Sequence, residues 1–143
     1  MSKMSDSNPT DHTIVNPSAW PRPRGYSNAV MATGRTLFLG GQIGWTADQK
    51  FEAQDFLGQT RQALQNIVTV LDEVGGGPEH IVRLTWYVTD VEDYRNAQKQ
   101  LGEVYRDVLG KHFPAMTLVQ VSALAEALAK VEIEATAVLP HKA

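Results

Sequence analysis

Apolar side chains recur at helical spacing in two stretches of the chain, and this pattern predicts two amphipathic helices. In residues 55–74 they return every three or four positions. Residues 75–78 (Gly-Gly-Gly-Pro) predict the end of this helix, because glycine accepts a left-handed cap and proline cannot continue a helix. In the second stretch Asp90 is the expected N-cap, and Gly110 lies near the expected end. Its apolar stripe consists of Tyr94, Ala97, Leu101, Val104, Tyr105 and Val108.

Segments rich in β-branched and aromatic residues predict the strands. Residues 27–32 and 36–40 are expected to form two short strands that pair as a hairpin around residues 33–35. Residues 81–88 predict a third strand, and residues 116–121 and 130–139 predict the closing strands. Residues 16–25 contain too much proline for a helix or a central strand and are expected to form an extended loop.

The order of these elements, ββαβαββ in two similar halves, predicts an α+β fold with both helices on one face of a sheet. Residues 1–13 are polar and are expected to form a flexible tail, so residues 14–140 are expected to be a single domain. The last strand carries Ile133, Ala135 and Ala137 on one face and Val138 on the other. A second, partly apolar face needs a cover, and we expect self-association to provide it.

Composition narrows the class of protein. The chain has 143 residues, of which 43% are apolar and 20% are charged, as in an ordinary globular domain. A formal net charge of −3 gives no general attraction for nucleic acid or for an anionic membrane. The absence of cysteine excludes a disulfide framework, and the four histidines show no metal-ligand spacing. With no secretory apolar segment and no run of about 20 apolar residues, the chain is expected to be soluble and cytoplasmic, without metal, membrane or nucleic-acid partners.

Six short segments occur in an order that is specific for one protein family. They are residues 25–27 (Gly-Tyr-Ser), 39–43 (Leu-Gly-Gly-Gln-Ile), 59–67 (Gln-Thr-Arg-Gln-Ala-Leu-Gln-Asn-Ile), 81–85 (Ile-Val-Arg-Leu-Thr), 113–115 (Phe-Pro-Ala) and 131–134 (Val-Glu-Ile-Glu). No single segment is decisive, but together they span nearly the whole domain. From about residue 16 to residue 140 the chain resembles the Rid family, also known as YjgF or enamine/imine deaminases.

This resemblance implies a chorismate-mutase-like fold of the bacillus type, with a six-stranded mixed sheet, assembled as a homotrimer. It also implies small-molecule ligands in three clefts between subunits. Glu132 would handle the attacking water and Tyr26 would orient the substrate. No cofactor is expected, because attack of water on an imine carbon requires only positioning and proton transfer. The residues expected to bind the substrate are Arg24, Gly40, Gly41, Gln42, Ala115, Met116, Thr117 and Leu118.

One position departs from the family pattern and changes the expected chemistry. Deaminating members carry an arginine after Pro-Ala that grips the substrate carboxylate, and Met116 stands in that place here. Arginine offers a carboxylate two charge-assisted bonds in one planar fork, whereas methionine has no hydrogen-bond donor. Loss of the arginine is expected to cost a carboxylate ligand about 3–5 kcal/mol of binding free energy. Methionine instead offers a soft apolar contact that suits a ring or an alkyl chain.

Two arginines are candidates for a replacement cation. Arg24 is the first, because its loop leads directly into Tyr26, and Arg83 is the second. Gly102 stands near the place where the family often has an asparagine. Glu134 lies two positions from Glu132 on the same strand face and is expected to be a solvated or salt-bridged residue without a catalytic role.

The expected protein is therefore a Rid-like trimer that binds small metabolites between subunits. If it is an enzyme, it hydrolyses a reactive enamine or imine to a carbonyl compound and ammonia, with specificity altered by Met116. The alternative is a non-catalytic ligand-binding or regulatory trimer that kept the cleft and lost the deaminase clamp. A weaker alternative, a ribonuclease or translation inhibitor, is disfavoured by the negative net charge and by the lack of an aromatic–basic stripe.

Overall fold

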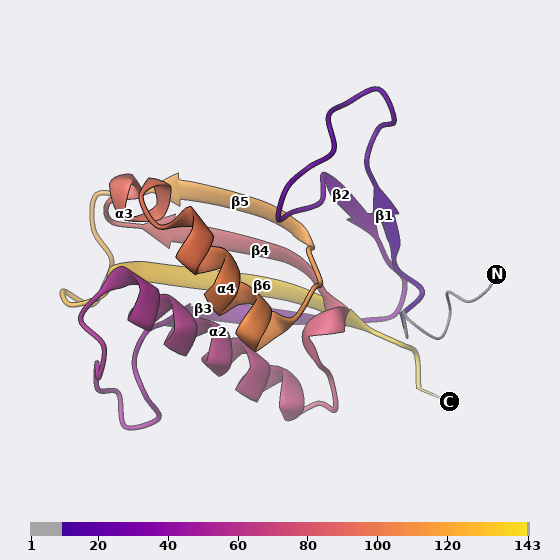
Figure 1. Cartoon of the computed structure of the whole chain (residues 1–143). Coiled ribbons are helices and arrows are strands. Elements are labelled where there is room, and N and C mark those ends of the chain that lie inside the picture. Colours follow the sequence, from indigo (N-terminus) through magenta and orange to yellow (C-terminus); the bar gives the residue numbers. More distant parts are fainter. Residues whose placement is uncertain (1–9, 143) are drawn as a thin grey trace.

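Four strands form one mixed sheet in the computed structural model, which describes residues 10–142. The β3/β6 and β6/β4 pairs are antiparallel, and the β4/β5 pair is parallel. A separate two-stranded ribbon, β1 with β2, stands beyond one end of this sheet (Figure 1). Across the main sheet the strands follow the order β3 (Arg35–Ile43), β6 (Val131–Leu139), β4 (Ile81–Val88) and β5 (Ala115–Gln120), and the ribbon consists of β1 (Thr13–Val15) and β2 (Ala29–Met31).

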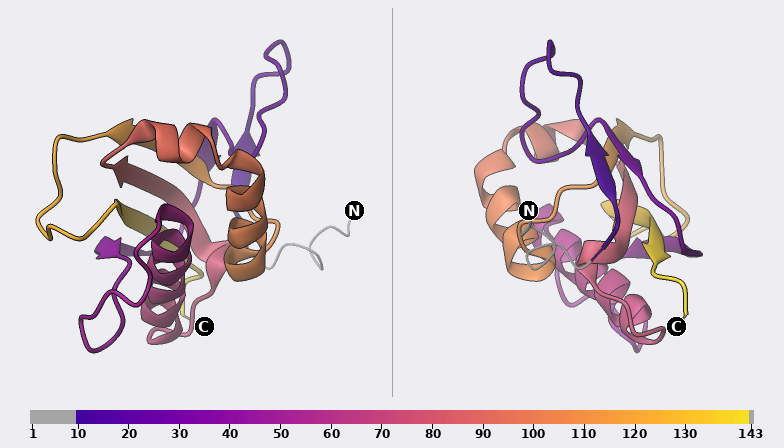
Figure 2. Two further views of the ribbon diagram at one scale, coloured as in Figure 1. Left: turned by 60° about the vertical axis from the view of Figure 1, so that its left-hand side comes forward. Right: turned by 90° about the vertical axis from the view of Figure 1, so that its right-hand side faces the viewer.

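Two long helices, α2 (Phe56–Asp72) and α4 (Gln98–Leu109), cover one face of the main sheet (Figures 1 and 2). A short helix, α3 (Val91–Arg95), precedes α4, and a single 3-10 turn, η1 (Pro78–His80), leads into β4. The predicted α+β class, with its helices on one face, is confirmed. None of the described helices is both long and apolar enough to cross a membrane.

Two details of the expected elements are wrong. Residues 27–32 and 36–40 do not form a hairpin, because β2 pairs with β1, so the strands divide into a four-stranded sheet and a ribbon instead of one six-stranded sheet. The second helix is interrupted at Asn96 and Ala97, where α3 ends and α4 begins. The pairing was missed because β1 has only three residues and lies next to the proline-rich loop, which carries no strand signal.

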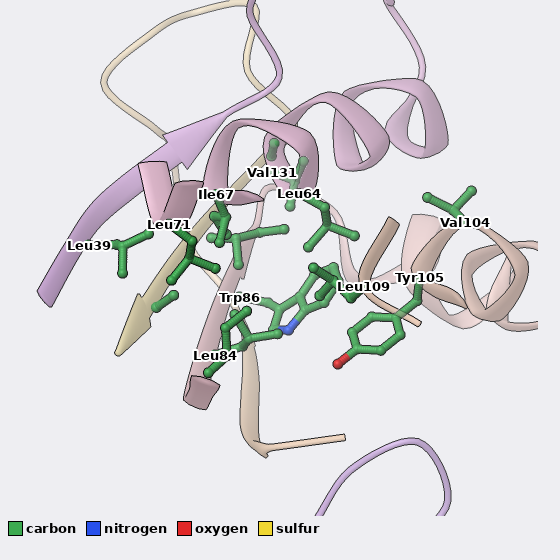
Figure 3. Packing of buried hydrophobic residues seen from close by; sticks show 14 of the residues in the cluster. Leu39, Leu64, Ile67, Leu71, Leu84, Trp86, Val104, Tyr105, Leu109 and Val131 are labelled. Carbon is green, nitrogen blue, oxygen red and sulfur yellow. The ribbon is translucent and has the colours of Figure 1, made fainter. Parts of the chain in front are cut away.

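The predicted amphipathic faces build the core between the helices and the sheet. Asp55 caps α2 by accepting a hydrogen bond from the Gly58 backbone at 3.1 Å, and Asp90 caps α3 by accepting one from the Glu92 backbone at 3.0 Å. Each fully buried leucine or isoleucine contributes roughly 1.5–3 kcal/mol to folding. Figure 3 shows part of this core, which includes Leu64, Ile67, Leu71, Leu84, Trp86, Val104, Tyr105 and Leu109.

The opposite face of the sheet carries no helix (Figure 2). Phe38 of β3 is 79% exposed, and Val119 of β5 is also exposed. Tyr87 of β4 donates a hydrogen bond to Glu134 of β6 at 2.8 Å, and this bond raises the pKa of the Tyr87 hydroxyl. Val138, which we expected to add to this face, is buried. We call the helix-free side the open face.

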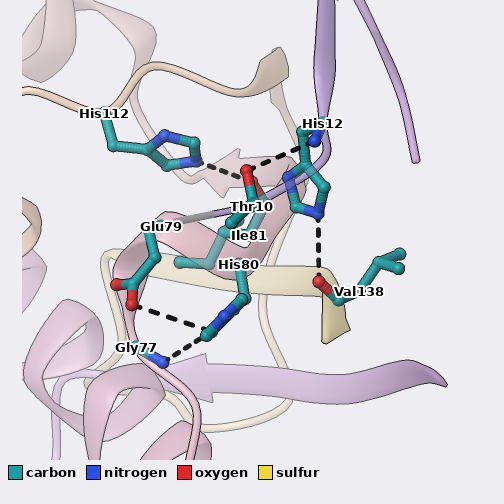
Figure 4. Close-up of polar contacts among 8 residues, drawn as sticks. All are labelled: Thr10, His12, Gly77, Glu79, His80, Ile81, His112 and Val138. Atoms are coloured by element: carbon teal, nitrogen blue, oxygen red, sulfur yellow. Dashed lines mark hydrogen bonds and ion pairs between the residues drawn. The ribbon is translucent and has the colours of Figure 1, made fainter. Parts of the chain in front are cut away.

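Three histidines that are distant in sequence lie near one another at one end of the sheet (Figure 4). His12 Nε2 lies 3.0 Å from the Val138 carbonyl, and His112 Nε2 lies 2.8 Å from the Ile81 carbonyl. The His80 ring accepts a hydrogen bond from the Gly77 backbone at 3.0 Å. In residues 10–142 no group of three histidine, aspartate or glutamate side chains is placed to hold a metal ion.

Part of the expected N-terminal tail packs against the domain. Residues 1–9 of the tail lie outside the described residues. Thr10 is buried, and His12 contacts the last strand through Val138. Contacts with the domain therefore begin ahead of residue 14.

The lowered pKa of His12 predicts that the folded protein loses stability on acidification. Burial lowers its pKa from the ordinary 6.5, and nearby His112 and His80 add to this, although the Val138 carbonyl and Asp11 oppose it. The unfolded chain therefore binds this proton more strongly, so the stability that His12 contributes is complete above pH 6.5 and falls as the pH drops below it.

Urea unfolding at several pH values between about 7.5 and 5.5 tests this dependence. We expect the urea midpoint to fall with pH, and to fall less in His12→Gln, whose amide can still reach the Val138 carbonyl. An equal pH dependence in both proteins would contradict the assignment to His12.

Candidate functional site

A pocket of about 380 Å³ opens on the helix side of β5. Its volume lies in the range of small-molecule sites. Four of the expected site residues line it: Arg24 and Tyr26 from the loop before β2, and Met116 and Leu118 from β5. Helices α3 and α4 form another wall, so the pocket joins segments that are far apart in the sequence.

Ser27 fixes the loop that carries Tyr26. Its hydroxyl donates a hydrogen bond to the Phe113 carbonyl, and its backbone N–H donates to the Pro114 carbonyl at 3.0 Å. Ser27 is buried and forms a parallel bridge with Ala115, the first residue of β5. These contacts hold Tyr26 beside Met116.

Aromatic rings make up much of the pocket wall. Tyr105 of α4 stacks on Phe113, with ring centroids 5.5 Å apart and planes 12° apart. Tyr105 donates a hydrogen bond to the His112 carbonyl, and burial raises the pKa of its hydroxyl. Five of the thirteen lining residues are aromatic, against 8% of the whole chain, so the pocket favours a flat apolar group. These five are Tyr26, Trp86, Tyr94, Tyr105 and Phe113.

A second group of expected site residues gathers where β3 meets β6. The register between these strands shifts between Leu39 and Gln42, which makes a bulge at Gly40 and Gly41. A Cβ atom at Gly41 would overlap the Glu132 carboxylate, so the Glu132 side chain lies directly against the Gly41 backbone. The Gln42 side-chain amide donates a hydrogen bond to the Gly40 carbonyl at 3.2 Å.

Helix α2 holds both strand segments of this second group. The buried Gln59 amide donates to the Leu128 carbonyl at 2.9 Å and accepts from the Lys130 backbone at 2.8 Å, just before β6 begins. Asn66 donates to the carbonyls of Ile43 and Trp45 at 3.1 and 2.9 Å, which fixes the end of β3. The backbone just before β6 and the end of β3, which flank Glu132, are therefore fixed by two polar side chains of one helix.

The two groups lie on opposite faces of the main sheet. Met116 is in register with Leu84, and Leu118 with Trp86, both of which are buried under the helices. Glu132 is in register with Tyr87, whose side chain lies on the open face. Because neighbouring residues in register point to the same side of a sheet, Glu132 and Met116 cannot enter one pocket within one chain.

The remaining expected residues do not line the pocket. Thr117 alternates with Met116 and Leu118 and is exposed, and Ala115 is partly buried beside Ser27. Arg83, the second candidate for a replacement cation, is exposed and in register with Ala115. It therefore does not share the pocket with Met116.

The sequence interpretation identified neither Arg106 nor Trp86 as a site residue. Both line the pocket. Arg106 lies one helical turn after Gly102, which also lines the pocket and which stands near the place where the family often has an asparagine. That spacing is the signal that could have identified Arg106.

Known proteins match this chain over nearly its whole length. The family model described as Endoribonuclease L-PSP matches residues 18–139. A RutC family protein of Pyrococcus horikoshii is 36% identical, over 82% of this chain and 90% of its own. The human 2-iminobutanoate/2-iminopropanoate deaminase is 30% identical, over 79% of each chain.

Solved structures agree with the sequence comparisons. The crystal structure of YyfB from Yersinia pestis, described as a protein of unknown function of the conserved Rid family, superposes with a TM-score of 0.78. It is 36% identical and covers 90% of this chain and 99% of its own. The expected chorismate-mutase-like fold is thereby confirmed. The chain belongs to the Endoribonuclease L-PSP family, which is the family of the YjgF/RidA proteins.

Proposed function

We propose that the chain is a cytoplasmic homotrimer that hydrolyses a reactive enamine or imine in clefts between its subunits. The observation that carries this proposal is the division of the site residues between two faces of the sheet. A second copy that laid its Glu132 region over the Met116 pocket of the first would complete the site, and three copies around one axis would complete three. The bare sheet face with exposed Phe38 is a surface that such an assembly would cover.

The chemistry follows from the groups that the assembly would bring together. Glu132 accepts a proton from water as the water oxygen attacks the imine carbon, and the nitrogen is protonated as the double bond becomes a single bond. A further proton reaches the nitrogen, the C–N bond breaks, and the hydroxyl becomes a carbonyl. One water is consumed and one ammonia is released. Tyr26 orients the substrate, and the polar groups of residues 40–42 and 115–118 hold its polar end.

Met116 changes which imines the site accepts. The human, goat and bovine relatives are named 2-iminobutanoate/2-iminopropanoate deaminases, for small imino acids. A methionine supplies no donor to a carboxylate, and the aromatic wall suits a larger apolar group. We therefore expect bulkier imines to be better substrates than 2-iminobutanoate.

Ammonia release from freshly generated imines tests the reaction, with 2-iminobutanoate compared to aromatic imines. Activity on the aromatic set alone would support a deaminase of altered specificity. If the protein releases ammonia from no imine but still binds a ligand, the result would favour the alternative, a non-catalytic binding trimer. Analytical ultracentrifugation at micromolar concentration tests the assembly, and a monomer would contradict the proposal.

A further inference from the structure

The pocket on the helix side of β5 contains two cations and no carboxylate among its lining residues. These cations are Arg24 and Arg106, and neither guanidinium group forms a hydrogen bond or ion pair with another residue in the part of the chain that the structure describes. By contrast, Arg61 of α2 pairs with Asp107 at 3.1 Å. Two unpaired guanidinium groups at a concave surface attract an anion.

Arg106 is the better placed of the two. Its two terminal nitrogens lie 3.4 and 4.0 Å from the point where a Cβ atom of Gly102 would be, so the guanidinium folds back along α4 onto the pocket wall. A longer side chain at position 102 would occupy this space. Arg24 lies in an irregular loop, next to Gly25 with a φ of +78°, whereas the helical backbone of Arg106 is fixed before any ligand arrives.

Trp86 provides an independent observation that points to a ligand in this pocket. It is 4% exposed and lines the pocket, and its indole N–H is buried without a hydrogen-bond partner. Figure 3 shows the indole nitrogen on the edge of the ring that faces Tyr105. An acceptor atom of a ligand bound in this pocket would satisfy the buried donor.

We propose that Arg106 supplies the anion-binding group that position 116 lacks, and that the pocket binds an aromatic carboxylate. The Arg106 fork holds the carboxylate, while the walls formed by Tyr26, Tyr105 and Phe113 hold the ring. In the reaction proposed above, on which this step rests, the substrate is then a 2-imino acid with an aromatic side chain and the product is the corresponding 2-oxo acid.

Isothermal titration calorimetry with phenylpyruvate measures binding apart from catalysis, because this 2-oxo acid has no imine to hydrolyse. Phenylacetone, which lacks the carboxylate, and 2-oxobutanoate, which lacks the ring, are the comparison ligands. We expect phenylpyruvate to bind more tightly than either. Arg106→Ala should weaken phenylpyruvate binding by about ten- to a hundredfold and leave phenylacetone binding unchanged. Arg106→Lys, a point charge without the fork, should fall between the two.

Arg95→Ala is the matched control, because Arg95 is exposed, pairs with Glu92 at 3.3 Å and does not line the pocket. Thermal unfolding of each variant confirms that it is folded. The inference is overturned if folded Arg106→Ala binds phenylpyruvate as the parent does, if Arg24→Ala alone removes binding, or if 2-oxobutanoate binds as tightly as phenylpyruvate.

The inference and the proposed reaction fail in different ways. Binding of phenylpyruvate through Arg106, without ammonia release from any imine, supports the inference and removes the deaminase function. Ammonia release from aromatic imines with no effect of Arg106→Ala on phenylpyruvate affinity removes the inference and leaves the deaminase function standing.

Discussion

Replacing Met116 with arginine is expected to raise kcat/KM for 2-iminobutanoate by roughly two to nearly four powers of ten. Met116 lines the pocket and is in register with buried Leu84, so a side chain at this position points to the helix side of the sheet. A guanidinium there gives the substrate carboxylate two charge-assisted bonds, worth about 3–5 kcal/mol. The measurement is the initial rate of ammonia release from freshly generated 2-iminobutanoate.

Met116→Leu is the control for this substitution, because leucine has nearly the same volume and no donor. It should leave the rate on 2-iminobutanoate close to that of the parent. A folded Met116→Arg protein with no gain on this substrate would show that the position does not face a bound carboxylate. The new guanidinium would share the pocket with Arg106, and the two positive charges repel each other. The increase in kcat/KM that Met116→Arg causes should therefore be larger in the Arg106→Ala variant than in the parent.

The elements that local signals determine were predicted well from the sequence. Helix α2 lies between a capping Asp55 and a run of glycines, and its apolar residues repeat on one face, so its position was predicted within about two residues. Strand β4 has the predicted bounds, 81–88. The pairing of β1 with β2 was missed because it depends on contacts between distant short segments. No periodicity exists in a three-residue strand.

Only part of the site was predicted, because local sequence signals identify residues but not the contacts between distant segments. Motif matching found the residues of both groups, and alternation alone shows that Met116 and Leu118 share one face of β5. The close contact between Gly41 and Glu132 depends on the bulge in β3, which the sequence pattern does not mark. Arg106 reaches the pocket because α4 packs over the end of the sheet, and this placement requires the tertiary fold.

The Glu132→Gln and Gly102→Trp variants are each expected to be nearly inactive alone. Mixed trimers that contain subunits of both variants are expected to recover activity. Loss of a general base lowers the rate by about 10²–10⁴. At Gly102 a Cβ atom meets only the flexible tip of Arg106, at 3.4 and 4.0 Å, so a tryptophan can fill the pocket without displacing the core. Glu134→Gln, two positions along the same strand face, is the matched control for Glu132→Gln and should change the rate little.

The recovery follows from a site that takes its pocket from one subunit and its glutamate from the next. In trimers refolded from an equal mixture of the two variants, about one quarter of the clefts combine an intact pocket with an intact Glu132. We therefore expect about one quarter of the parent activity, measured as ammonia release from the preferred imine. If pocket and glutamate acted within a single chain, no cleft in the mixture would be intact, and the activity could not exceed the average of the two variants measured separately.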